Sequence, residues 1–203
     1  MIAILTADII NSRKLPPSKW IKGLKTLLNT IGKTPNDWEI YRGDEFQLEI
    51  KNPEEALFTA FQLKAYFKSI NLDIRISLGF GDITYKSKKI TESNGNAFIR
   101  SGETFETLKK QKLNLAINSG NIDFDEEINL ILKLSLSFMD NWLQQAAEFV
   151  LIAIQNPTLS QEEIGVKLGI NQAAVSRRQK RSNYELLLQV EQHFRGKIKT
   201  LEV

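Results

Sequence analysis

Apolar residues recur along the chain with two different periods, and the period predicts which segments are strands and which are helices. A continuous apolar run at residues 2–5 is typical of a strand buried on both faces. Alternate residues are apolar in 45–50 and in 73–81, as in strands with one buried face. Segments 16–31 and 52–67 instead repeat apolar residues at helical spacing. Strands and helices are therefore expected to alternate in this part of the chain.

A hairpin is predicted where Gly43-Asp44 separates a further expected strand at 38–42 from the strand at 45–50. A further helix is expected over 95–110 and a fifth strand over 112–117. The predicted order is β-α-β-β-α-β-α-β. This is the order of a split βαβ, ferredoxin-like layer of sheet and helices.

The pattern changes after the fifth predicted strand. A polar, glycine-containing joint at 119–125 is followed by 127–155, where apolar residues recur at helical spacing throughout. We expect one bent helix or two helices there, packed on the sheet and broken at Asn156-Pro157. The predicted fold class is α+β, with three parts: a ferredoxin-like (palm) domain at 1–120, connecting helices at 121–156 and an all-α helix-turn-helix domain at 157–203.

The amino-acid composition excludes several kinds of functional site. The chain has 203 residues, of which 42% are hydrophobic and 25% charged, as in a soluble globular protein. It has no cysteine, which excludes disulfides, cysteine-bound zinc and thiol chemistry. His193 is the only histidine, so a histidine triad or histidine-cluster metal site cannot form, and we interpret it as a surface residue.

The start of the chain predicts neither export nor membrane insertion. Residues 1–10 lack a basic leader, and Asp8 comes too early for a signal peptide. No apolar run approaches the roughly 20 residues of a membrane span. We therefore expect a cytoplasmic protein with no membrane partner.

Positive charge is concentrated near the end of the chain. Residues 1–155 contain 19 Lys or Arg and 19 Asp or Glu, whereas residues 156–203 contain 8 and 5. The whole net charge of +3 therefore arises in the last quarter. This asymmetry favours a polyanion as the partner of that part.

Acidic residues are predicted to meet at one edge of the sheet. Asp8 ends the first strand, and Asp44 and Glu45 lie in the hairpin that should pair beside it. Together with the Ile9 carbonyl, these oxygens suit Mg²⁺ or Mn²⁺, which bind a few protein oxygens and keep positions for water and phosphate. Local hydrogen bonding in a turn is the alternative reason for acids at these places.

The segments ILTADII (4–10) and YRGDEFQ (41–47) resemble the palm domain of class III nucleotide cyclases and GGDEF-type diguanylate cyclases. In those families an Asp, the hydrophobic residue after it and an acid in the hairpin hold the metals. The resemblance assigns these roles to Asp8, Ile9 and Asp44, with Glu45 as an additional ligand. It implies a nucleotide- or metal-binding domain, or an enzyme in which two ions activate a hydroxyl and neutralise a leaving pyrophosphate.

The same families carry an Asn and an Arg on the helix after the fourth strand, where they stabilise the transition state. Asn96 and Arg100 are the candidates here, four residues apart and hence on one helix face. They lie nearer to the preceding glycine than the family pattern has them. Aligned on that glycine, Ile99 and Glu103 take the two positions.

The stretch TLSQEEIGVKLGINQAAVSRRQKRS (158–182) predicts two short helices joined by a tight turn. Ser160 and Glu163 form a capping box at the start of the first helix. Gly169 ends that helix, and Asn171 caps the second. The stretch resembles the helix-turn-helix of bacterial regulators and of sigma-factor region 4.

The second helix has one polar and basic half when its residues are placed about 100° apart. That half consists of Gln172, Ala173, Ser176, Arg177, Lys180 and Arg181. Gln and Arg can form bidentate contacts with adenine and guanine in a major groove. Arg178, Arg181 and Lys167 are the candidates for phosphate contacts. A solvated basic face on an ordinary helical hairpin is the alternative.

The two halves in this order, with ITESNGNAFIRSGETFETLKK (90–110) between them, resemble the SatD family over essentially the whole chain. The resemblance implies a cytoplasmic bacterial regulator. We expect a DNA-binding homodimer, because operators usually contain two half-sites. Its palm domain would sense a nucleotide with a divalent ion or serve as a dimerisation platform. The alternatives are a Mg²⁺-dependent nucleotidyl cyclase carrying a helix-turn-helix, and a protein-interaction module that never meets DNA.

Overall fold

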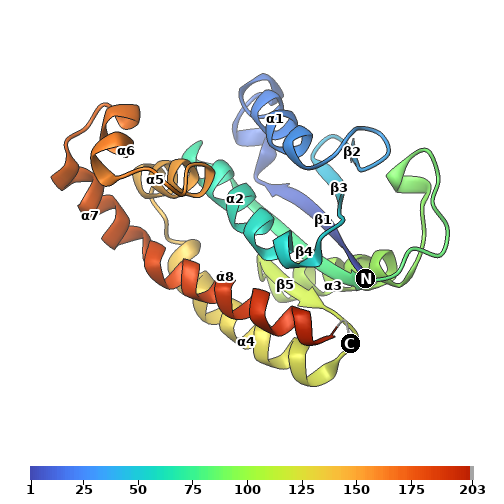
Figure 1. The fold of residues 1–203 in the computed structure, drawn as a ribbon. Coiled ribbons are helices and arrows are strands. Elements are labelled where there is room, and N and C mark those ends of the chain that lie inside the picture. The colour runs from blue at the N-terminus through green and yellow to red at the C-terminus, as the bar shows by residue number, and fades with distance from the viewer. Residues whose placement is uncertain (202–203) are drawn as a thin grey trace.

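Five strands form one mixed sheet in the order β2-β3-β1-β4-β5 in the computed structural model, which describes residues 1–201 (Figure 1). Their bounds are Ile2–Ile10 for β1, Trp38–Tyr41 for β2, Glu45–Ile50 for β3, Asp73–Gly81 for β4 and Leu115–Asn118 for β5. Neighbouring strands are antiparallel except for β4 and β5, which are parallel. The run predicted at 2–5 is only the first half of β1, because β3 and β4 continue to pair with it as far as Asp8 and Ile10.

Eight α-helices lie within the described residues. They are Ile21–Ile31 (α1), Ala56–Ser69 (α2), Asn96–Gln111 (α3), Ile122–Met139 (α4), Gln144–Gln155 (α5), Gln161–Leu168 (α6), Gln172–Ser182 (α7) and Tyr184–Ile198 (α8). The segment 127–155 contains two helices, one of the two arrangements expected. The joint expected at 119–125 is shorter than predicted, because Asn121 caps α4 by accepting a hydrogen bond from the Phe124 N–H at 3.0 Å.

The two faces of the sheet are covered differently. Alternate residues of β1 enter the main core, which also contains residues of α1, α2, α4, α5 and α8. Helix α3 packs on the other face, across β1 and β4. A Cβ atom at Gly79 would lie 2.3 Å from the Ala97 carbonyl and the Ser101 N–H nitrogen, so the missing side chain lets α3 lie directly on β4. Beneath the helix, the Ser101 hydroxyl donates to Thr6 Oγ1 at 2.8 Å.

The hydrophobic core continues from β1 into the last helix. Phe194 and Ile198 of α8 are fully buried, and the Phe194 ring lies 5.9 Å from that of Phe80 and 6.2 Å from that of Phe124. Figure 1 shows α8 running back beside α4 from α7. The C-terminal helices are therefore anchored on the sheet through shared apolar contacts.

A buried cation fixes the end of α4 to the rest of the molecule. The Lys64 ammonium, on α2, lies 2.6 Å from the Asp73 carboxylate and 2.5 Å from that of Asp140. Asn114 donates to the second Asp140 oxygen at 3.1 Å. Lys64 is 2% exposed, so its ammonium has been removed from water and is held by these two carboxylates.

Candidate functional site

Asp8 faces the side of the sheet on which α3 packs, between a residue of β3 and a residue of β4. Its register partners are Glu45 and Arg75. Arg75 Nη1 donates to both Asp8 oxygens, at 3.0 and 3.3 Å. Burial raises the pKa of the Asp8 carboxyl, and the positive charge of Arg75 opposes this rise without cancelling it.

Asp44 occupies the predicted hairpin turn and is tied to the segment after β1. Its Oδ2 accepts a hydrogen bond from the Ser12 hydroxyl at 2.6 Å. Its backbone carbonyl accepts from the Ile9 N–H at 3.2 Å, and the Ile9 side chain is buried in the core. The contact between Ile9 and the turn is therefore made by the N–H of Ile9.

Glu45 pairs with a cation from α3. Its Oε1 lies 3.2 Å from the Lys109 ammonium, which also lies 4.3 Å from the centre of the Phe105 ring. Burial lowers the pKa of Lys109, but the hydrogen bond to Glu45 and its negative charge outweigh this and raise the pKa overall. Burial, assisted by Glu45, raises the pKa of Tyr41 to about 12.

The structure brings Asp8, Asp44 and Glu45 to one edge of the sheet, because Asp8 lies opposite Glu45 in the register and Asp44 directly precedes Glu45. Each of the three already has a partner within the chain. Among residues 1–201, no group of three Asp, Glu, His or Cys side chains is arranged to hold a metal ion. As they stand, these residues do not form a prepared site for Mg²⁺ or Mn²⁺, because Arg75 and Lys109 supply the positive charge that an ion would bring.

The candidates Asn96 and Arg100 lie at the opposite end of α3 from this cluster. Arg100 donates to the Phe80 carbonyl at 2.6 Å, and Phe80 pairs with the beginning of β1. Arg75 and Phe80 are five residues apart on β4, or about 16 Å in a strand. The structure therefore does not bring Asn96 and Arg100 together with the acids.

The predicted caps of the two short C-terminal helices are all present. Ser160 and Glu163 form both hydrogen bonds of the capping box, Gly169 has the left-handed conformation with φ of 65°, and Asn171 accepts from the Ala174 N–H at 2.9 Å. Gly165 lies where the helices meet, since a Cβ there would be 2.7 Å from the Ile170 carbonyl oxygen. The pair α6–α7 is therefore closely packed and has a fixed geometry.

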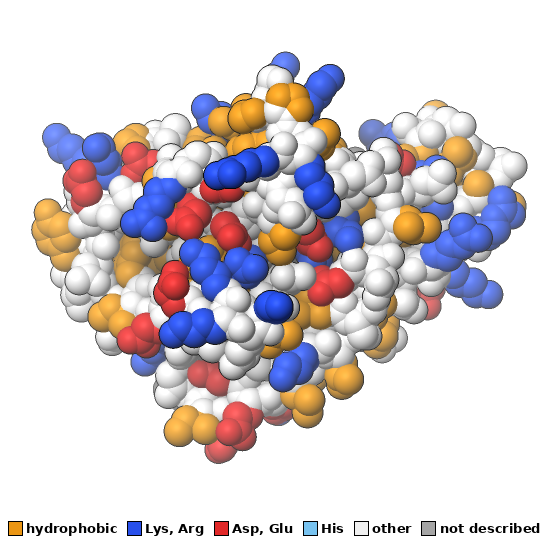
Figure 2. Space-filling model, turned by 180° about the vertical axis from the view of Figure 1, so that it is seen from behind, with side chains coloured by type: hydrophobic (Ala, Val, Ile, Leu, Met, Phe, Trp, Pro, Cys, Tyr) orange, Lys and Arg blue, Asp and Glu red, His pale blue; other side chains and the backbone are white. Residues whose placement is uncertain are grey.

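Most of the polar residues predicted on α7 face solvent. The exposed ones are Gln172, Ala173, Arg177, Lys180 and Arg181, while Ser176 is half-buried. Among residues 1–201, no acidic side chain forms an ion pair with Arg177, Lys180, Arg181 or the exposed Lys167 of α6. Figure 2 shows Lys and Arg side chains projecting from the right-hand end, where these helices lie in that view.

Arg178 differs from the other predicted contact residues, because it turns toward α5. Its Nη1 lies 3.1 Å from the Glu148 carboxylate and 3.4 Å from the Gln145 carbonyl oxygen. This ion pair joins α7 to α5. Arg178 therefore holds the helix in place, and its guanidinium is already engaged.

A chain of glutamines joins α6 to α7, and its middle member, Gln161, was not predicted from the sequence. Gln172 Nε2 donates to Gln161 Oε1 at 2.5 Å, and Gln161 Nε2 donates to Gln179 Oε1 at 2.7 Å. Gln161 and Gln172 are each the first residue of a capped helix, which is the sequence signal that would have identified the pair. This contact fixes the side chain of Gln172 and leaves its Oε1 and one N–H for another partner.

The molecule is thus an α+β protein with a five-stranded mixed sheet and a basic helix pair at one end. None of the helices in residues 1–201 has the length and apolar character needed to cross a membrane. A model of the SatD family matches residues 1–197, and the chain belongs to that family. No curated protein and no solved structure matches the chain.

Proposed function

We propose that the protein is a DNA-binding transcriptional regulator in which α6 and α7 form a helix-turn-helix. The observation that carries the proposal is the exposed face of α7, where Arg177, Lys180 and Arg181 have no acidic partner among residues 1–201. A phosphate backbone would supply the missing negative charge, with release of counterions.

The residues of α7 have different roles in this proposal. Gln172 and Arg177 contact base edges, because amide and guanidinium groups can pair with adenine and guanine in the major groove. Lys180, Arg181 and Lys167 contact phosphates. Arg178 keeps α7 on α5 through Glu148. The half-buried Ser176 and the exposed Ala173 lie within the same face, where close approach to a base is possible.

We also propose a function for the domain that contains the sheet. The elements β1-α1-β2-β3-α2-β4 and their antiparallel order support a ferredoxin-like, palm-type domain. We assign it a ligand-sensing role at Asp8, Arg75, Glu45 and Lys109, for a nucleotide or another phosphorylated ligand. Arg75 and Lys109 would contact phosphate oxygens. Mg²⁺ or Mn²⁺ would have to displace these two cations from the carboxylates.

The nucleotidyl cyclase alternative has less support. It needs Asn96 and Arg100 beside the acids, and they lie at the other end of α3. Incubation with nucleoside triphosphates and Mg²⁺ or Mn²⁺ tests it directly. Pyrophosphate release that is abolished by Asp8→Ala and by Asp44→Ala would establish the enzyme and overturn the sensing role.

The regulator proposal is tested by fluorescence anisotropy with labelled duplex DNA from the region upstream of the protein's own gene. We expect the wild type to bind this duplex more tightly than a scrambled one. Arg177→Ala and Gln172→Ala should weaken binding roughly tenfold each, as for loss of a specific base contact. Arg13→Ala removes an exposed arginine that lies just after β1, outside α6 and α7, and it should leave binding unchanged. Equal affinity of all four proteins would overturn the proposal.

A further inference from the structure

One face of α4 is apolar and exposed. Ile122, Leu130 and Leu134 are 73%, 61% and 65% exposed, although the opposite face of this 18-residue helix is buried in the core. Glu126 and Lys133 lie on the same face and are also exposed. Leucines at this spacing on a charged helix face are typical of contact with another protein surface.

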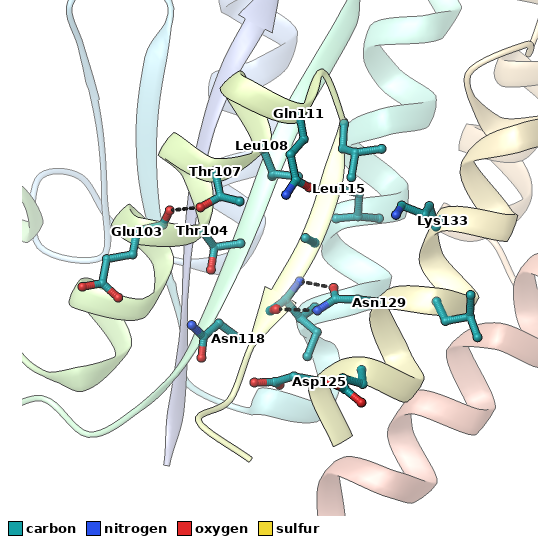
Figure 3. Close-up of a pocket in the computed structure, with 15 residues that line it drawn as sticks. Glu103, Thr104, Thr107, Leu108, Gln111, Leu115, Asn118, Asp125, Asn129 and Lys133 are labelled. Atoms are coloured by element: carbon teal, nitrogen blue, oxygen red, sulfur yellow. Dashed lines mark hydrogen bonds between the residues drawn. The ribbon is translucent and has the colours of Figure 1, made fainter. Parts of the chain in front are cut away.

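Side chains of α4 close the edge of the sheet beside this face. Asn129 accepts from the Ile117 N–H at 2.8 Å and donates to the Ile117 carbonyl at 2.9 Å (Figure 3). Asp125 accepts from the Ser119 N–H at 2.8 Å. Four helical residues span about 6 Å and two strand residues about 6.6 Å, so Asp125 and Asn129 match the spacing of Ser119 and Ile117. The backbone groups of this edge are thus occupied, so a partner would pack on the helix face and would not extend the sheet.

A groove of about 580 Å³ runs between α3 and α4 above β5 (Figure 3). Glu103 stands on its α3 wall, and Glu126 and Lys133 stand on its α4 wall. Among the described residues, none of these three side chains forms an ion pair. The groove therefore offers two unpaired carboxylates and one unpaired ammonium group next to the exposed leucines.

We propose that this face binds a second copy of the chain, with the two α4 helices antiparallel and crossing at Leu130. Glu126 lies four residues before Leu130 and Lys133 three residues after it. In such a pair, Glu126 of each copy lies beside Lys133 of the other, and Leu130 meets Leu130 on the two-fold axis. The surface is self-complementary, as an isologous dimer requires.

This dimer rests on the proposed function, because a regulator that binds a two-fold operator needs two copies of its DNA-binding helices. Helices α6 and α7 take no part in the α4 face, so both copies keep their basic surfaces free for two half-sites. A partner of one charge sign would leave either Glu126 or Lys133 unmatched. A second copy in the antiparallel arrangement matches both.

Cysteine cross-linking tests the crossing point, because the natural chain has no cysteine. Leu130→Cys would place two sulfurs near the axis, where Cβ atoms about 3.8 Å apart form a disulfide. Under mild oxidation, we expect this variant to become a covalent dimer on a non-reducing gel. Val166→Cys, at an 84% exposed apolar position on α6, is the matched control and should run on the same gel as an uncross-linked single chain. Equal cross-linking of the two variants would overturn the proposal.

Sedimentation of the full chain without DNA gives the second readout. The wild type should be a dimer at micromolar concentration, and Leu130→Glu with Leu134→Glu should be a folded monomer by circular dichroism. Glu126→Lys alone and Lys133→Glu alone should each weaken the dimer several-fold, and the double exchange should restore it. A monomeric wild type, or a dimer unaffected by these changes, contradicts the inference. Neither experiment contains DNA, so failure of the dimer proposal is distinguishable from failure of DNA binding.

Discussion

The indole N–H of Trp142 donates to the carbonyl of Ser182, the last residue of α7, at 2.9 Å, and both residues are buried. Trp142 lies just after α4, close to the Lys64 cluster that fixes Asp140. The end of α7 is therefore tied to the connection between the sheet and the C-terminal helices. The orientation of the basic face therefore depends on a buried contact at the end of α7.

Trp142→Phe should lower the free energy of unfolding by about 1–3 kcal/mol, because it leaves the buried Ser182 carbonyl without its donor. Trp20→Phe is the matched control, since the buried Trp20 N–H has no hydrogen-bond partner among residues 1–201. Urea denaturation of both variants checks this. A larger loss for Trp20→Phe would contradict the assigned role of the hydrogen bond.

Lys64→Met should destabilise the protein by on the order of 3 kcal/mol, because it leaves Asp73 and Asp140 facing each other without their shared cation. Chemical denaturation measures the change. Lys22→Met, at an exposed position on α1, should have little effect. If the two variants were equally stable, the Lys64 cluster would have no role in holding α4.

Gly79, beneath α3, and Gly102, on the open side of α3, should respond in opposite directions to alanine. Gly79→Ala should cost on the order of 2 kcal/mol, because the new methyl group would overlap the backbone of α3. Gly102→Ala should stabilise the protein by about 1 kcal/mol, since the space around it is open and alanine favours the helix. Thermal unfolding of the pair measures both effects, and the same sign for both would contradict the close contact.

The raised pKa of Asp8 gives a pH-dependent prediction. A carboxyl whose pKa is raised on folding adds stability below its ordinary value of 3.8 and loses that contribution as the pH rises through the folded-state pKa. The stability of the wild type relative to Asp8→Asn should therefore fall as the pH is raised from acid toward neutral. Urea denaturation over a pH series checks the sign. A relative stability that rises with pH would show that Arg75 outweighs burial.

Local signals in the sequence predicted much of the fold. The caps Ser160, Gly169 and Asn171 depend on residues within one or two turns, and each was identified with its role. Strands such as 45–50 and 73–81 were predicted because alternating apolar and polar residues indicate one buried and one exposed face. The start of α4 was missed, since its polar first turn resembles a joint and only the Asn121 cap distinguishes it.

Contacts between residues far apart in the sequence could not be predicted from such local signals. The partner of Asp8 is Arg75, which comes 67 residues later and faces it only because β1 and β4 are neighbours. Arg178 was predicted to contact phosphate, and its ion pair with Glu148 depends on how α5 packs. The separation of Arg100 from the acids follows from the direction in which α3 crosses the sheet.

The salt dependence of DNA binding tests the central claim most directly. The logarithm of the binding constant for the upstream duplex should fall linearly with the logarithm of salt concentration, because cations of α6 and α7 displace counterions from phosphates. Arg181→Ala should reduce the slope by about one, and Arg13→Ala should leave it unchanged. A slope near zero, or the same slope for all three proteins, would contradict DNA binding by this face.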